Sequence, residues 1–152
     1  MNIVFAGTPQ FAADHLKLLV DSQHEIKCIL TQPDRGSGRG KKVIPSPVKE
    51  IGINNGIEVL QPYSLKEESI VRSLESLKPD LLLVVAYGLL IPKKVLDIAE
   101  KGSINIHASI LPRWRGAAPM EYSIYSGDSE SGISYMRMTE GLDEGPTLEI
   151  HK

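Results

Sequence analysis

Short apolar segments recur along the chain and alternate with longer segments in which apolar residues follow a helical spacing. The apolar segments are rich in β-branched residues and cover positions 3–6, 26–30, 57–60, 81–86, 104–108 and 133–138. Runs of this length and composition predict strands. Because they alternate with helical segments, the pattern predicts an α/β fold with a mostly parallel, twisted sheet and helices on both faces.

Helices are expected between the strands because capping signals precede amphipathic segments. Such signals occur at Thr8-Pro9, at Ser46-Pro47 and in the capping box at positions 64–67. Two more helices are expected, one over 92–101 with Gly102 as its stop signal and one over 117–126. The sequence therefore predicts five helices in all, the first of them ending near position 20.

Composition and length fit one globular domain. The chain has 152 residues, 41% of them apolar, which is enough for a core. No apolar run reaches the roughly 18–20 residues of a membrane helix, and no basic region precedes the apolar N-terminus, so we expect no membrane contact and a cytoplasmic location. Cys28 is the only cysteine, and we expect it to be buried in its strand.

Positive charge is concentrated in one segment. The formal net charge is −2, yet residues 31–50 hold five lysines or arginines against two acidic residues. Within this segment, the stretch 35–42 is rich in glycine, serine and basic residues and predicts a loop. Two interpretations stay open, namely an ordinary solvated face and a contact with a polyanion.

Asn105 and His107 are the strongest candidates for chemistry. They lie two residues apart near the carboxyl end of a predicted strand, so both side chains leave the same face of the sheet at the edge where sites form. An amide donor and an imidazole can stabilise an oxyanion and move a proton, as acyl transfer requires. Asp143, in a turn-rich segment, could orient the imidazole. The structural alternatives are a buried polar pair bonded to the backbone and an ordinary turn aspartate.

Other kinds of chemistry have less support. Gly7 follows the first strand, but the glycine fingerprint of a dinucleotide site is absent. The histidines at positions 15, 24 and 151 lack metal-ligand spacing, and no acidic cluster accompanies them, so we expect no metal. No serine or cysteine has a base nearby in the sequence, which favours direct transfer over a covalent intermediate.

Six motifs resemble a known family along the whole chain. They are FAGTPQFA at 5–12, TQPDRGSGRGKK at 31–42, PSPVKE at 45–50, VVAYGLLIP at 84–92, SINIHASILPRWRGAAP at 103–119 and GLDEGP at 141–146. The Asn-x-His motif with the later aspartate resembles enzymes that use 10-formyltetrahydrofolate. The basic segment narrows the resemblance to the N-terminal catalytic domain of the methionyl-tRNA formyltransferases. We therefore expect residues 1–152 to form a partial, Rossmann-like formyltransferase domain, incomplete at its C-terminus and without the family's C-terminal β-barrel.

The resemblance also implies an activity and a set of site residues. The reaction would transfer a formyl group from 10-formyltetrahydrofolate to the α-amine of methionyl initiator tRNA in translation initiation, by direct attack through a tetrahedral intermediate. The catalytic residues would be Asn105, His107 and Asp143. The folate would contact Tyr87, Gly88, Leu89, Leu90, Ile91, Ser109, Ile110, Leu111 and Pro112. The tRNA would contact Arg35, Arg39, Lys41 and Lys42. A monomer is expected from the family.

Two alternatives and four open positions accompany this interpretation. The chain could act on a small amine or on water with the same folate, or it could bind folate or tRNA without turnover. Glu121 and Pro146 depart from the family's usual residues, and Pro146 could reshape the loop that carries Asp143. Arg113 and Arg115 stay unassigned between tRNA contact and local structure.

Overall fold

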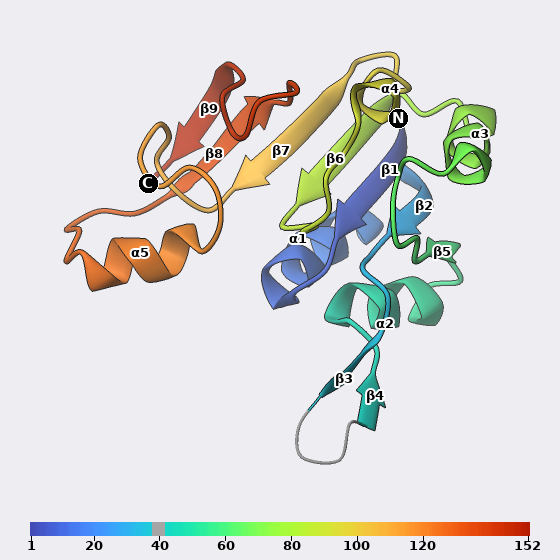
Figure 1. Ribbon diagram of the computed structural model, residues 1–152, viewed down its shortest axis with the longest axis horizontal. Coiled ribbons are helices and arrows are strands. Elements are labelled where there is room, and N and C mark those ends of the chain that lie inside the picture. Colours follow the sequence, from blue (N-terminus) through green and yellow to red (C-terminus); the bar gives the residue numbers. More distant parts are fainter. Residues whose placement is uncertain (38–41) are drawn as a thin grey trace.

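A seven-stranded sheet forms the centre of the molecule in the computed structural model, which describes residues 1–37 and 42–152 (Figure 1). The order across the sheet is β5-β2-β1-β6-β7-β8-β9. The strands are β1 (Asn2–Gly7), β2 (Glu25–Leu30), β5 (Val59–Leu60), β6 (Leu81–Val85), β7 (Ser103–His107), β8 (Ile133–Arg137) and β9 (Thr147–His151). The strands from β5 to β7 run parallel, and β8 and β9 are antiparallel to their neighbours. The prediction of a mostly parallel sheet is confirmed.

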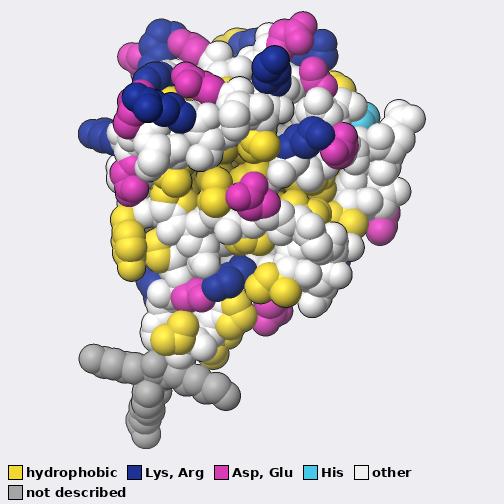
Figure 2. All heavy atoms as spheres, turned by 90° about the vertical axis from the view of Figure 1, so that its right-hand side faces the viewer, with side chains coloured by type: hydrophobic (Ala, Val, Ile, Leu, Met, Phe, Trp, Pro, Cys, Tyr) yellow, Lys and Arg dark blue, Asp and Glu magenta, His cyan; other side chains and the backbone are white. Residues whose placement is uncertain are grey.

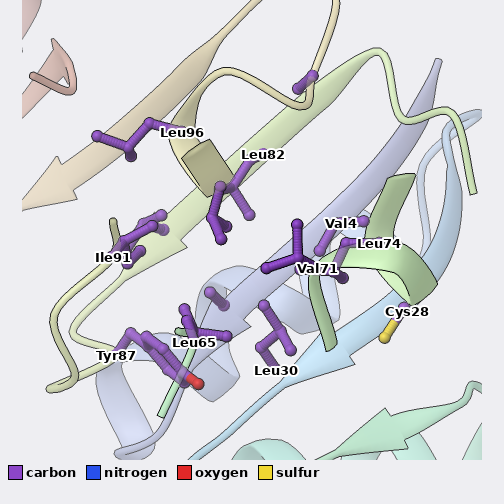
Figure 3. Packing of buried hydrophobic residues seen from close by; sticks show 14 residues of the cluster. Val4, Cys28, Leu30, Leu65, Val71, Leu74, Leu82, Tyr87, Ile91 and Leu96 are labelled. Atoms are coloured by element: carbon purple, nitrogen blue, oxygen red, sulfur yellow. The ribbon is translucent and has the colours of Figure 1, made fainter. Parts of the chain in front are cut away.

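Helices cover both faces of this sheet. Buried residues of α1 (Gln10–Val20) and α2 (Pro47–Asn54) pack with one cluster of strand residues. Buried residues of α3 (Glu68–Ser76) and α4 (Lys93–Leu96) pack with the cluster on the other face, which Figure 3 shows. Helix α5 (Pro119–Tyr125) lies beyond β8 and β9 and buries only Ser123 (Figure 1). Cys28 is buried in β2, as predicted.

The predicted helix starts are confirmed in one case and wrong in two. The Ser46 hydroxyl accepts a hydrogen bond from Lys49 N at 3.0 Å, and Pro47 is the first helical residue. Thr8 does not cap α1, because its hydroxyl donates instead to the carbonyl of Tyr87. The capping box at 64–67 is also wrong: α3 begins at Glu68, and the Ser64 hydroxyl accepts locally from Lys66 N.

Two other predicted segments differ from the structure. Helix α4 ends at Leu96 instead of near position 101, because the next residues turn and bond elsewhere: Glu100 N donates to Pro79 O, and Lys101 N donates to Asp80 O. The stretch 35–42 is not a simple loop. Its ends form an antiparallel ladder of β3 (Arg35–Ser37) and β4 (Lys42–Ile44), which projects away from the sheet in Figure 1.

The register of β7 decides where its polar side chains point. Ser103 pairs with Leu82 of β6, and Asn105 pairs with Val84. Leu82 and Val84 belong to the core cluster under α3 and α4. Alternate residues of a strand share a face, so the side chains of Ser103, Asn105 and His107 leave β7 on the side of α3 and α4.

Candidate active site

The carboxylate of Asp143 brings together the residues that the sequence singled out. The Asn105 amide nitrogen donates to Asp143 Oδ1 at 3.2 Å, and His107 Nδ1 lies 3.6 Å from Asp143 Oδ2. The three side chains are largely enclosed, since those of His107 and Asp143 are only 8% and 12% exposed and Asn105 is buried. Asp143 has a φ of 50°, a left-handed conformation in which aspartate is tolerated better than most residues. The cluster therefore combines an amide, an imidazole and a carboxylate in a site shielded from water.

Backbone groups from the loop after β7 complete this cluster. Gly116 N donates to Asp143 Oδ2 at 2.8 Å, and the carbonyl of Trp114 lies 2.8 Å from His107 Nε2. A carbonyl can only accept, so Nε2 carries a proton. His107 Nδ1 faces the carboxylate, and in the neutral ring it is the nitrogen without a proton.

The segment 109–112 builds the turn beneath this loop. The buried Ser109 hydroxyl donates to Arg113 O at 2.6 Å, and Ser109 O accepts from Ser134 Oγ. The amide of Leu111, which is also buried, donates to the same Ser134 hydroxyl, and the Leu111–Pro112 peptide is cis. Of the four residues predicted to contact folate here, only Ile110 and Pro112 therefore present side chains toward solvent.

The segment 87–91 is likewise divided between core and surface. Tyr87 and Ile91 are buried, and Figure 3 shows Tyr87 beside Leu65 and Leu30. Burial raises the pKa of Tyr87 to about 12, and its hydroxyl has no partner among the described residues. Gly88, Leu89 and Leu90 are at least partly exposed. A ligand at this segment would meet those three residues and the backbone of the other two.

A cleft of about 530 Å³, which the sequence did not predict, lies between α4, the start of β7 and the end of β8. It is lined by Lys93, Leu96, Asp97, Gly102, Ser103, Arg137 and residues 138–141. Ser103 shares the face of β7 with Asn105, and the loop 138–141 precedes Asp143 by two residues, so the cleft shares one strand and one loop with the cluster. Two features of the sequence relate to this cleft: Ser103 lies two residues before Asn105 in the same strand, and the segment after β8 is rich in turn residues.

The basic segment is only partly described. Arg35 is exposed at the base of the β3–β4 ladder, Lys42 lies in β4, and Arg39 and Lys41 fall outside the described residues. Lys49 is paired with Asp34 and lowers the pKa of that carboxyl together with Gln61. On the side drawn in Figure 2, the basic and acidic side chains of the described part lie interspersed.

Two further findings concern membranes and metals. Within residues 1–37 and 42–152, no helix has the length and apolar character needed to cross a membrane. The same ranges contain no group of three or more histidine, cysteine, aspartate or glutamate side chains placed to hold a metal ion.

The amide–imidazole–carboxylate cluster at the end of a parallel strand suits acyl transfer, and the chain belongs to the formyl transferase family, whose sequence model matches residues 1–152. It is 57% identical over 148 residues to a methionyl-tRNA formyltransferase of Pseudomonas fluorescens (strain Pf0-1), a match that covers 97% of this chain and 46% of that protein. The identity to the methionyl-tRNA formyltransferase of Ectopseudomonas mendocina (strain ymp) is also 57%, over 97% of this chain and 47% of that protein. The chain thus spans about half the length of the curated relatives it matches.

Solved structures confirm the predicted Rossmann-like formyltransferase fold. A phosphoribosylglycinamide formyltransferase from Streptococcus pneumoniae TIGR4 superposes with a TM-score of 0.74 at 20% identity, over 99% of this chain and 79% of that chain. A formyltetrahydrofolate deformylase from Pseudomonas syringae pv. tomato str. DC3000 gives a TM-score of 0.72 at 21% identity, over 99% of this chain and 49% of that chain. At these identities the likeness concerns the fold alone.

Proposed function

We propose that this chain is the catalytic, folate-binding part of a cytoplasmic enzyme that transfers the formyl group of 10-formyltetrahydrofolate to the α-amine of methionyl initiator tRNA. The observation that carries the proposal is the contact of Asp143 with both Asn105 and His107. The 57% identity to methionyl-tRNA formyltransferases supports this amine acceptor over a small amine or water.

Each member of the cluster has a distinct role in the proposed reaction. The amine nitrogen forms a bond to the formyl carbon while the carbonyl electron pair moves onto oxygen. The Asn105 amide and the imidazole of His107 stabilise the negative charge on that oxygen, and both act in a site shielded from water. The proton leaves the amine as the bond to the donor nitrogen breaks. Asp143 orients the imidazole and assists this proton transfer to the donor nitrogen.

The cleft at the start of β7 is a candidate for part of the formyl donor's site. The donor supplies the activated formyl group, and this chain supplies a cavity of about 530 Å³ that shares a loop with Asp143. Cavities for small molecules usually fall between roughly 300 and 1,000 Å³. Residues 88–90 and the exposed parts of 109–112 lie on the loops that follow β6 and β7, at the carboxyl edge where such folds bind ligands. We propose that the donor contacts these loops as well as the cleft.

The basic segment is the proposed contact for the tRNA. Arg35 and Lys42 lie in the β3–β4 ladder that follows β2 in the chain, and Arg39 and Lys41 lie between them in the sequence. Phosphate contacts of this kind position a nucleic acid and make its affinity depend on salt. Replacing all four residues by alanine should therefore raise KM for charged tRNA and lower the salt slope by roughly 0.7–0.9 per lost contact. Lys27→Ala, at the start of β2 and paired with Glu25, is the matched control.

The decisive test of catalysis measures formyl transfer by the intact protein supplied with 10-formyltetrahydrofolate and methionine-charged initiator tRNA. Asn105→Ala, His107→Ala and Asp143→Asn should each lower kcat by about 10²–10³-fold. Asparagine is chosen at 143 because it tolerates the left-handed backbone there. Glu130→Gln, which breaks an exposed pair with Lys152, should leave kcat unchanged. No transfer by the parent protein, or undiminished transfer by the three variants, would falsify the proposal.

A further inference from the structure

We infer that Asp128 is a positioning residue for the reaction: through Arg113 and Trp114, it holds the loop whose backbone fixes His107 and Asp143. The inference rests on the proposed function and adds to it a side chain that touches none of the reacting groups. It also assigns Arg113, which the sequence left open between tRNA contact and local structure.

Three hydrogen bonds converge on the carboxylate of Asp128. Arg113 Nε donates to Oδ2 at 2.8 Å and Arg113 Nη2 donates to Oδ1 at 2.7 Å, a two-pronged pairing that fixes the guanidinium in plane with the carboxylate. Trp114 Nε1 donates to Oδ2 at 2.7 Å. The carboxylate is 15% exposed, and the hydrogen bonds from Arg113 and Trp114 hold its pKa well below the usual range. Asp128 therefore stays ionised at any pH at which an enzyme of this kind would be assayed.

Aromatic packing adds to this anchor. The guanidinium of Arg113 lies 4.2 Å from the centre of the Trp114 ring, and that ring stacks on Tyr122 of α5 with centroids 5.6 Å apart. The indole of Trp114 is thus held by three contacts: a hydrogen bond from its edge to Asp128, the guanidinium of Arg113 over its ring, and stacking on the ring of Tyr122. Together these contacts restrict the Trp114 side chain.

Trp114 connects the anchor to the active site without an intermediary. Its side chain binds Asp128, and its carbonyl accepts the proton of His107 Nε2 at 2.8 Å. Its φ of 59° lies in the left-handed region, which a residue with a large side chain adopts only when its surroundings enforce it. Two residues further on, Gly116 N donates to Asp143 Oδ2. The same short loop therefore holds the histidine and the aspartate of the cluster.

Loss of the anchor should change the state of the histidine. Without Asp128, Trp114 can leave the left-handed region and withdraw its carbonyl from Nε2. The imidazole is then free to carry its proton on Nδ1 and to donate it to Asp143, so the neutral ring changes tautomer. A misplacement of about 1 Å in a catalytic group can cost on the order of 10²-fold in rate. Asp128→Ala should therefore lower kcat by about 10- to 100-fold and leave both KM values within threefold.

The test combines turnover with nitrogen-15 NMR of His107 in the intact protein. The parent should show the neutral tautomer with the proton on Nε2, and Asp128→Ala should shift the signals toward the Nδ1–H form. Trp114→Phe keeps the stacking ring and removes the Nε1 donor, so it should produce the same kind of shift. Asp128→Asn keeps one oxygen for Trp114 and should fall between the parent and the alanine variant. Glu130→Gln, two positions away at an exposed residue paired with Lys152, is the matched control.

The outcomes separate this inference from the proposed function. Unchanged His107 signals in folded Asp128→Asn and Trp114→Phe overturn the inference, even if Asp128→Ala does not fold. The inference is also overturned if kcat of these variants falls only in proportion to their loss of stability while the His107 tautomer signals stay the same. A parent protein without formyl transfer overturns the proposed function, whereas the tautomer shift would still support the link from Asp128 to His107.

Discussion

Replacing Gly145 by alanine tests whether formyl transfer depends on the close packing of the Asp143 loop against β8. A Cβ atom at this position would sit 1.8 Å from the carbonyl oxygen of Arg137 and 3.0 Å from its carbonyl carbon. Both obstacles are backbone atoms of β8, so neither can rotate away. The φ of Gly145 is not in the left-handed region, and the close approach to β8 alone requires glycine there.

The magnitude follows from the separation that alanine would impose. Carbon and oxygen atoms normally stay at least about 3.4 Å apart, so loop and strand would have to part by about 1.6 Å. Gly145 is two residues from Asp143, whose bonds to Asn105 and Gly116 measure 3.2 and 2.8 Å and would break. A displacement of about 1 Å costs on the order of 10²-fold, and we expect formyl transfer by Gly145→Ala to fall by at least that factor, or about 2.7 kcal/mol.

The assay compares kcat/KM for charged initiator tRNA in three proteins together with their thermal midpoints. Gly56→Ala is the matched control, because Gly56 follows α2 and has open space around its Cβ position. That control should lose some stability from its left-handed φ of 65° and keep its kcat/KM. Transfer by Gly145→Ala within twofold of the parent, at an unchanged midpoint, would show that the position of Asp143 does not govern the reaction.

Two further predictions concern stability. Burial raises the pKa of the Cys28 thiol to about 12, so the unfolded chain loses this proton at lower pH than the folded one and stability falls as the pH rises above about 8.5. The unfolding free energy, measured in urea, should decline between about pH 8 and 10, and Cys28→Ala should make that decline smaller by about 1.5–2 kcal/mol. An identical decline in both proteins would show that the Cys28 thiol does not cause it. Ser46→Ala should cost about 1–2 kcal/mol in the same measurement, because the hydroxyl caps α2 and also bonds the buried Thr31 hydroxyl; Ser64→Ala, which caps no helix, is its control and should cost less than half as much.

The sheet could be predicted because its signal is local. The parallel strands are buried on both faces, so each shows up as a continuous apolar run whatever its partners are. The same logic placed Asn105 and His107 on one face, since the period of a strand is fixed by its backbone. Helix starts were less predictable. The Thr8 hydroxyl donates to the carbonyl of Tyr87, which lies far away in the sequence and has no local signature. The Ser64 hydroxyl accepts from Lys66 N in a local turn, and such turns compete with helix caps for the same residue types.

The site could be predicted only in part, because its contacts join distant segments. Asp143 reaches Asn105 through the pairing of β7 with β8 and a turn beyond it, neither of which has a local signature. The cleft arises between α4 and the loop 138–141, and it depends on the early end of α4. The backbone groups that fix His107 and Asp143 could not be predicted at all, since every residue has an amide and a carbonyl.

Pro146 illustrates how such backbone contacts decide whether a substitution matters. The proline removes an amide donor, and the sequence left open whether it reshapes the loop of Asp143. The carbonyl of Pro146 accepts a hydrogen bond from Arg137 N at 3.0 Å, and β9 begins at the next residue. A proline at the entrance of an edge strand loses no ladder bond, and its fixed φ limits the freedom of the turn. Gly145 allows the close approach to β8 and Pro146 stiffens the exit, so the two residues together keep Asp143 beside Asn105 and His107.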